Sequence, residues 1–330
     1  MIYKNNARIK RRILNEIKKA DTVILCRHKR PDGDAVGSTM GLADIISTSF
    51  PGKRVFLDNE DYSEYLAFLG PEGPRPADED YKNALVIVLD TGGSSRISSQ
   101  RALKGARVVK IDHHIKDDDY GDVRWVEEER SSVCEMVADF YYSFPKELKI
   151  TKKGAECLYT GMVTDSGRFR FRGTTSQTMR LAGNLLDEGI DFERIYSILR
   201  ADDFETLLFE AKLTEKIAIT EHGVAYLKIS RAFRNRHHIS LEDASNTVSL
   251  MEHIKGSLIW IAFIENDDGT VRVRLRSRFV EIQPIAKKYH GGGHACAAGS
   301  TVFSDEEEKM LLDDADALLA SFKASNPDCI

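Results

Sequence analysis

The stretch TVILCRHKRPDGDAVGS, residues 22–38, joins a short apolar run to a loop that carries one histidine and two aspartates. The apolar run TVILC does not alternate with polar residues, which is typical of a strand covered on both faces of a sheet. Helical patterns separate it from three similar runs, RVFLD (54–58), ALVIVLD (84–90) and ARVVKID (106–112). The sequence therefore predicts an α/β fold with a doubly wound, mainly parallel sheet and helices on both faces.

The pattern changes in the last third of the chain, which predicts a second, smaller α/β domain. We expect a metal-binding catalytic domain over residues 1–190, a helical connector over 191–222 and a substrate-binding domain over 223–330. A cleft between the two domains would hold the substrate. The elements expected after the connector are a strand from 223, a helix over 240–252, a hairpin over 257–278 with its turn at Asp268 and Gly269, and a helix from about 305.

Charge and cysteine content exclude several classes of protein. The net charge of −5 argues against a broad duplex-binding protein, which needs a large basic surface. No run of about 18 apolar residues occurs, and the N-terminal 20 residues follow an amphipathic helical pattern rather than that of a signal peptide. The five cysteines form no CxxC pair, so neither a disulfide framework nor a zinc knuckle is expected, and a reducing cytoplasm fits best. They are Cys26, Cys134, Cys157, Cys296 and Cys329.

Carboxylates and histidines gather where three of the predicted strands end. In an open parallel sheet these ends meet at the crevice where ligands bind. One such aspartate alone is more often a helix cap, and a lone histidine is more often structural. Several carboxylates at one crevice raise each other's pKa values, so such a cluster is tolerated mainly when cations neutralise it. The candidate residues are His28, Asp32 and Asp34 after the first strand, Asp90 after the third, Asp112, His113 and His114 after the fourth, and Asp165 at the end of a helix.

The candidate ligands are carboxylates and imidazoles without a thiolate. This set favours Mn²⁺ or Mg²⁺ over a structural zinc ion, and the imidazoles favour Mn²⁺, expected as two ions per active site. Gly33 and Gly37 suit the tight loop and the close helix approach that would turn Asp32 and Asp34 inward.

Five motifs occur in the order found in the DHH phosphoesterase family, which this sequence resembles over about residues 20–300. Four lie in the first predicted domain, and GGGHACAAG in the second is similar to the signature of the DHH-associated C-terminal domain. The short two-domain length resembles the bacterial oligoribonucleases and pAp phosphatases called nanoRNases. The first four motifs are HKRPDGDAVGS, VLDTGG, IDHHI and VTDSGRF.

The resemblance implies a role for each residue at the strand ends. A hydroxide bridging two metal ions would attack phosphorus in line. His114 would face the substrate phosphate as a catalytic residue, and Asp112 would support the histidine pair from behind rather than bind metal. The implied metal ligands are His28 and Asp32 on one ion, Asp34, His113 and Asp165 on the other, and the catalytic Asp90 on both.

Substrate recognition is expected in the second domain. VRVRLRSR (271–278) places alternate arginines on one face of a strand, and Arg276 with Ser277 matches a recurring position of the DHH-associated domain. Arg272 and Arg278 fit a solvated face better. The run GGGH leaves backbone N–H groups free to approach a phosphate, above all if the following ACAAG opens a helix, although a glycine run alone can be a flexible turn. The expected substrate-binding residues there are Gly291, Gly292, Gly293 and His294.

The leading hypothesis is a Mn²⁺-dependent exoribonuclease that hydrolyses oligoribonucleotides of about two to five nucleotides and also removes a phosphate from pAp. A cyclic di-AMP or pApA phosphodiesterase, a pyrophosphatase or polyphosphatase, and a longer-strand exonuclease of the RecJ type are alternatives within the family. A nucleotide sensor without catalysis is the alternative from another class. The resemblance also implies a homodimer, without membrane or long-duplex partners.

Overall fold

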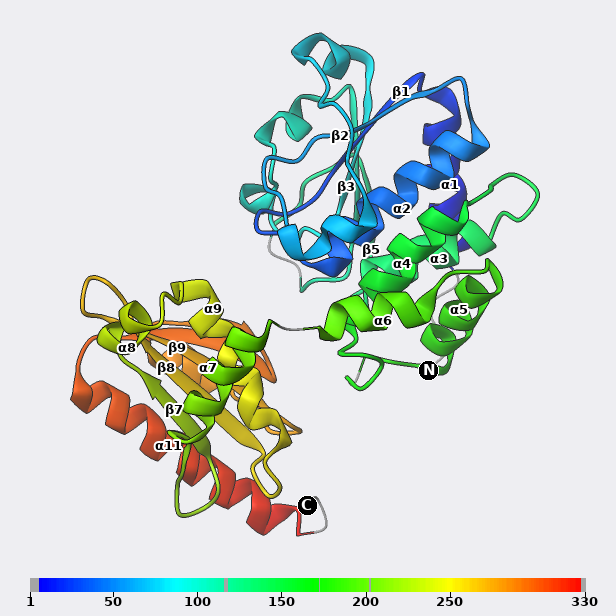
Figure 1. The fold of residues 1–330 in the computed structure, drawn as a ribbon. Helices are drawn as coiled ribbons and strands as arrows, with labels where there is room; N and C mark the ends of the chain where they lie inside the picture. The colour runs from blue at the N-terminus through cyan, green and yellow to red at the C-terminus, as the bar shows by residue number, and fades with distance from the viewer. Residues whose placement is uncertain (1–5, 116–117, 172, 202, 328–330) are drawn as a thin grey trace. The chain divides into compact units, whose positions relative to one another are not determined.

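The computed structural model describes residues 6–115, 118–171, 173–201 and 203–327. The chain forms two compact units, Met1–Arg200 and Ala201–Ile330, each with its own sheet (Figure 1). The α/β class predicted from the sequence is confirmed. Cys329 lies outside the described residues.

The first unit contains a five-stranded sheet in the order β2-β1-β3-β4-β5, in which every neighbouring pair is parallel. Four strands match the predicted runs, whereas β5 (VRWV) was not predicted because it is short and half-exposed. The order reverses between β1 and β3, so the loops after these two strands open at the crevice where ligands bind. The strands are β1 Thr22–Cys26, β2 Arg54–Leu57, β3 Leu85–Leu89, β4 Arg107–Asp112 and β5 Val123–Val126.

The expectation of helices on both faces of this sheet holds in part. The largest hydrophobic core of the described residues lies on one face, where α-helices cover the sheet (Figure 1). Short 3₁₀ helices cover the other face, among them Asp78–Asn83 and Gln100–Lys104. The α-helices that contribute to this core are α1 Ala7–Lys19, α2 Gly33–Ser49, α3 Val133–Tyr142, α4 Lys152–Asp165, α5 Ser176–Asp187 and α6 Phe192–Arg200.

The helical connector expected over 191–222 contains two helices. Phe192–Arg200 (α6) belongs to the first unit, and Phe204–Thr214 (α7) belongs to the second. Asp203 precedes α7 in an extended conformation as its N-cap residue, which separates the two helices. The three-part division at residues 190 and 222 stays a prediction.

The second unit has a six-stranded sheet in the order β10-β11-β9-β8-β7-β6, in which only β7 and β8 are parallel neighbours. The predicted hairpin is present as β8 and β9, with Gly269 at a positive φ of 87° in its turn. ACAAG does not open a helix, because residues from Ala297 onward form a strand instead. The strands are β6 Ala218–Ile219, β7 Ala225–Ile229, β8 Ile259–Glu265, β9 Val271–Ser277, β10 Gly292–His294 and β11 Ala297–Val302.

Two hydrophobic cores cover the two faces of the second sheet. One core joins the sheet to the C-terminal helix, and the other joins it to α7 and the helices near residue 245. No helix of the described residues is long and apolar enough to cross a membrane. The remaining helices are α8 Arg231–Arg236, α9 Leu241–Asn246 with the 3₁₀ helix Thr247–His253 behind it, α10 Gln283–Lys288 and α11 Asp305–Ser325.

Candidate metal centre

Asp90 lies at the centre of the residues predicted from the strand ends. It directly follows β3, is 1% exposed, and has a positive φ of 54° that turns its side chain out of the strand. Its Oδ2 lies 3.4 Å from Nε2 of His28, and its Oδ1 lies 3.5 Å from Nε2 of His113. Loops from β1, β3 and β4 therefore meet at one carboxylate, as the strand order requires.

The backbone fixes the ring orientation of both histidines. Nδ1 of His28 lies 2.8 Å from the carbonyl of Lys29, and Nδ1 of His113 lies 3.1 Å from the carbonyl of Arg130. A carbonyl only accepts hydrogen bonds, so each Nδ1 must carry a proton. When neutral, both rings therefore present an Nε2 lone pair to the carboxylates, which is the arrangement that metal-binding histidines use.

The helix pair α2 and α4 supplies the other carboxylates. Asp34, in the first turn of α2, accepts N–H groups of Val133 at 2.6 Å and Cys134 at 2.8 Å, which lie at the N-terminus of α3. Asp165 ends α4, and its Oδ2 lies 3.4 Å from Nε2 of His113. Helix α3 thus holds Asp34 in place by charge-assisted hydrogen bonds, and its dipole favours the ionised form.

Close packing of α2 against α4 brings these two carboxylates together. A Cβ atom at Gly37 would lie 2.4 Å from the backbone oxygen of Cys157 and 3.0 Å from the Sγ of Cys134. Only glycine allows this approach, which agrees with the close helix contact predicted for Gly37. Asp32 caps α2 and accepts the N–H groups of Asp34 and Ala35, while its Oδ2 lies 3.8 Å from Nε2 of His28.

Asp112 and His114 form a separate pair at the edge of this cluster. Nδ1 of His114 donates to Oδ1 of Asp112 over 2.9 Å, and the same Nδ1 lies 3.5 Å from Oδ1 of Asp90. Asp112 is fully buried, and the Nζ of the buried Lys110 lies 3.3 Å away. The carboxylate of Asp112 therefore holds the proton on Nδ1 and sets the tautomer and orientation of the His114 ring.

The buried carboxylates of this cluster repel one another, which shifts their pKa values. Burial raises the pKa of Asp34 well above its usual range, and the charges of Asp90 and Asp165 raise it further. Burial also raises the pKa of Asp165 to about 7, against the opposing charge of His113. Burial would lower the pKa of His28, but its hydrogen bonds to Asp32 and Asp90 raise it to about 10. The carboxylates thus compete for few positive charges, which bound cations would supply.

The residues present fit divalent cations. The buried Oδ1 of Asp90 has no hydrogen-bond partner, although it faces two imidazole rings. Three overlapping sets of side chains have ligand atoms within 4.8 Å of one another, and Asp90 belongs to two of them. Carboxylate oxygens with imidazole nitrogens suit Mn²⁺ and related ions. The sets are Asp90 with His113 and His114, His28 with Asp32 and Asp90, and Asp34 with His113 and Asp165.

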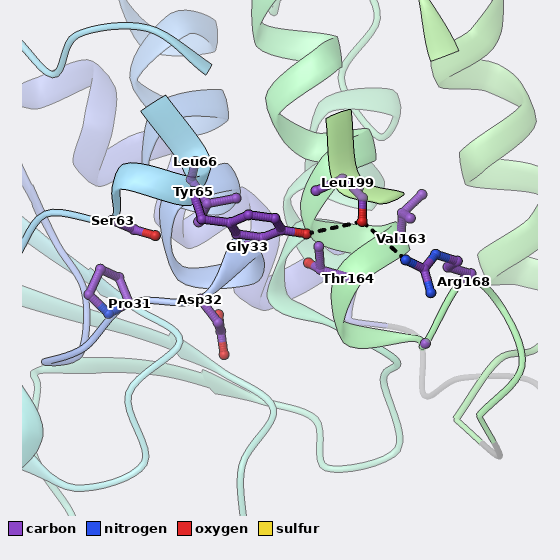
Figure 2. A pocket seen from close by; sticks show the side chains of 11 residues that line it. Pro31, Asp32, Gly33, Ser63, Tyr65, Leu66, Val163, Thr164, Arg168 and Leu199 are labelled. Carbon is purple, nitrogen blue, oxygen red and sulfur yellow. Dashed lines mark hydrogen bonds between the residues drawn. The ribbon is translucent and has the colours of Figure 1, made fainter. Parts of the chain in front are cut away.

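A cavity of about 290 Å³ opens beside Asp32 (Figure 2). Its wall is mostly apolar and includes Leu66 and Val163. Tyr65 and Arg168 lie at its rim, where both donate to the carbonyl oxygen of Leu199, at 3.5 and 3.1 Å. An apolar hollow with an aromatic ring and a guanidinium group next to a metal site suits a flat, partly polar ligand.

In the second unit, the strand register places Arg276 in line with the glycine segment. Arg276 pairs with Ala297 of β11, and Ala297 pairs with His294 of β10, so these positions share one face of the sheet. The side chain of His294 lies outside what the structure describes. Ser277 points to the opposite face, and its hydroxyl donates to the carbonyl of Val280. The structure therefore brings Arg276, but not Ser277, to the predicted substrate face.

The three glycines of this segment differ in what they permit. A Cβ atom at Gly291 would lie 2.0 Å from the backbone oxygen of Gly299, and Gly293 has a φ of 134° with the backbone oxygen of Ala297 at 2.6 Å. At Gly292 no atom lies within 4 Å of an added Cβ atom. Gly291 and Gly293 are thus required by the hairpin, and Gly292 is the position that leaves open space for a ligand.

Comparison with known proteins assigns this architecture. Residues 22–162 match the model of the DHH family, N-terminal domain, and residues 222–321 match that of the DHHA1 domain. A bifunctional oligoribonuclease and PAP phosphatase NrnA from Bacillus subtilis (strain 168) is 36% identical over 92% of this chain and 97% of its own length. The chain belongs to the DHH family.

Two further proteins are similar to this chain over most of its length. A probable bifunctional oligoribonuclease and PAP phosphatase NrnA from Streptococcus mutans is 36% identical over 93% of this chain and 98% of its own length. The crystal structure of an exopolyphosphatase-related protein from Bacteroides fragilis superposes with a TM-score of 0.85 over 95% of this chain and 98% of its own. At 22% identity, that structure supports the fold alone.

Sequence reasoning missed the groups that hold the DHH-domain residues in place. These are the N-terminus of α3, which binds Asp34, and Lys110 beside Asp112. The pattern SVCE at 132–135 is a signal that could have been used, because Ser132 caps α3 and accepts the N–H of Glu135. A buried lysine within an apolar strand gives no comparable signal.

Proposed function

We propose that this chain is a metal-dependent phosphoesterase that hydrolyses short oligoribonucleotides to mononucleotides and dephosphorylates pAp. The observation that carries the proposal is the position of Asp90, whose two oxygens face histidines from two other loops. The names of the two relatives that are 36% identical support the same substrates. A hydrolase active on small nucleotides is also consistent with the net charge of −5, which does not favour a broad duplex-binding protein.

Each residue of the cluster receives a role in this proposal. Two divalent ions, Mn²⁺ by the chemistry of the donors, would supply a hydroxide nucleophile at neutral pH and neutralise charge on the phosphate. Asp90 would be shared between the ions, because its two oxygens face different sets of ligands. The remaining ligands would be His28 and Asp32 for one ion, and Asp34, His113 and Asp165 for the other.

His114 and Asp112 would complete the active site without binding metal. The carboxylate of Asp112 fixes the proton on Nδ1 of His114 and stabilises the ring when it is positively charged. Such an imidazolium can bind a phosphate oxygen or give its Nε2 proton to the departing oxygen. We assign His114 this role because Asp112 orients its ring and the same Nδ1 lies 3.5 Å from Oδ1 of Asp90, which places the imidazole beside the proposed metal ligands.

Nucleoside binding would use the cavity beside Asp32. A base could lie against Tyr65 and the apolar wall, with Arg168 at its edge, while the adjoining phosphate reaches the metal ligands. In the DHHA1 domain, Arg276 and the open backbone at Gly292 would bind a further phosphate.

A cytoplasmic setting and a homodimer also belong to this proposal. The four described cysteines are free thiols, as expected in a reducing compartment, and light scattering would measure the oligomeric state.

A turnover panel with Mn²⁺ tests the proposal. The substrates are pAp, pApA, a five-nucleotide RNA, cyclic di-AMP and pyrophosphate, each compared with the variant Asp90→Ala. Rapid loss of pAp and the RNA, reduced by several orders of magnitude in Asp90→Ala, is the expected result. Pyrophosphate or cyclic di-AMP as the best substrate would overturn the substrate assignment. Binding of nucleotides without any turnover would favour the sensor hypothesis.

A further inference from the structure

Three arginines of β9 form a row on one face of the DHHA1 sheet. Arg272, Arg274 and Arg276 alternate with Val273 and Leu275, which are buried in the core on the opposite face. Side chains two positions apart on a strand repeat at about 6.6 Å. We call these three residues the arginine row.

The guanidinium groups of the arginine row have no acidic partner among the described residues. All three are half-buried, none forms an ion pair within that part of the chain, and Arg272 donates to the hydroxyl of Ser245 over 3.5 Å. Arg276 donates only to the carbonyls of Leu275 and Ala298, and the buried Nε of Arg274 has no hydrogen-bond partner. Burial and the charge of Arg274 together lower the pKa of Arg276 to about 10. Half-buried cations without anions are unfavourable, so this row is suited to an anionic ligand.

The neighbouring strand leaves the arginine row accessible. Arg276 pairs with Ala297, Arg274 with Gly299 and Arg272 with Thr301, so small residues lie beside the long side chains. Next to Gly299 lies Gly292, where an added Cβ atom would meet nothing within 4 Å. An extended chain can therefore lie along β9 without meeting bulky side chains of β11.

We propose that the arginine row binds successive phosphates of one single-stranded oligoribonucleotide, and so sets the preference for strand length. The phosphates of an extended strand repeat at a distance comparable to that of alternate residues in β9. The inference rests on the function proposed above and extends it to Arg274 and Arg272. A strand with three or more phosphates can contact all three arginines, whereas pAp and pApA carry only two phosphates.

Binding along the arginine row predicts an effect that depends on strand length. For 5′-phosphorylated RNA of five nucleotides, Arg274→Gln and Arg272→Gln are each expected to lower kcat/KM about tenfold, because a charge-assisted hydrogen bond is lost. Both variants should hydrolyse pAp and pApA at close to the wild-type rate, since two phosphates do not need the whole row.

Arg278→Gln is the matched control. Arg278 directly follows the same strand, is exposed, and donates to the backbone carbonyl of Glu252. Its replacement should therefore leave kcat/KM unchanged for every substrate. Thermal unfolding of all three variants monitors the fold. Equal losses on pAp and on five-nucleotide RNA, or no loss on either, would overturn the inference.

Salt dependence gives a second measurement that does not need catalysis. Binding of a labelled five-nucleotide RNA to the full chain in chelator is followed by fluorescence anisotropy at several salt concentrations. Loss of one phosphate contact should reduce the slope of log K against log salt by about 0.7 in Arg274→Gln and not in Arg278→Gln. If the wild type hydrolyses none of the nucleotides, the proposed function is wrong. An unchanged slope in Arg274→Gln would instead refute the arginine row.

Discussion

Replacing Gly37 by alanine tests whether the contact between α2 and α4 holds the metal centre together. The added Cβ atom would lie 2.4 Å from the backbone oxygen of Cys157, about 1 Å closer than ordinary van der Waals contact, which begins at 3.4 Å. This nearest atom belongs to the backbone and not to a flexible side chain, so the two helices must separate. Overpacking of this kind costs about 1–3 kcal/mol of unfolding free energy.

The same displacement should reduce activity more than stability. Asp34 belongs to α2 and Asp165 ends α4, so separation of the helices moves the two carboxylates apart. A displacement of about 1 Å at a catalytic constellation lowers turnover about 100-fold. Urea denaturation measures the free energy of unfolding, and hydrolysis of pAp across a Mn²⁺ titration separates a loss of metal affinity from a loss of kcat.

Gly183→Ala supplies the control for this prediction. Gly183 lies inside α5, an added Cβ atom would meet nothing within 4 Å, and its φ lies outside the positive range. Alanine there should stabilise the protein by about 0.5–1 kcal/mol with unchanged kcat. If Gly37→Ala showed wild-type unfolding and turnover, close packing of α2 on α4 would not be what positions the carboxylates.

Three other substitutions test separate parts of the structure. Asp112→Asn should lower kcat for pAp about 10- to 100-fold, because the charge-assisted hydrogen bond to His114 is lost. The dependence of activity on Mn²⁺ concentration should not change. A shifted dependence would show that Asp112 binds the metal. Leu66→Trp should fill the cavity and raise KM for pApA at unchanged Mn²⁺ affinity, and an unchanged KM would exclude the cavity as a nucleoside site. Burial would raise the pKa of Asp58, but hydrogen bonds from Tyr81, Arg75 and Arg101 lower it. Asp58 therefore stabilises the fold above about pH 4, and Asp58→Asn should lose about 2–3 kcal/mol at pH 7, a difference that must shrink as the pH falls below 4.

The positions of the acidic residues could be predicted because they depend on strand order alone. Continuous apolar runs indicate parallel strands, and the carboxyl ends of such strands must meet. His28 and Asp90 follow adjacent strands on the two sides of the order reversal, so the sequence was enough to bring them together. The ring orientation of His113 was not predictable, because it depends on the carbonyl of Arg130, 17 positions away in a loop without a motif.

The glycine segment shows why its conformation needed the structure. A glycine-rich run followed by small residues is compatible with a helix N-terminus and with a tight hairpin, since local propensity differs little between them. The choice was made by β9, whose residues from Val271 to Arg276 pair with β11 and draw ACAAG into the sheet. That pairing aligns Gly292 with Gly299 and Arg274, so the proposed ligand would meet an open strand surface and not the N-terminus of a helix. In the proposed function the affinity for phosphate would therefore come from the arginine side chains of β9 rather than from the glycines.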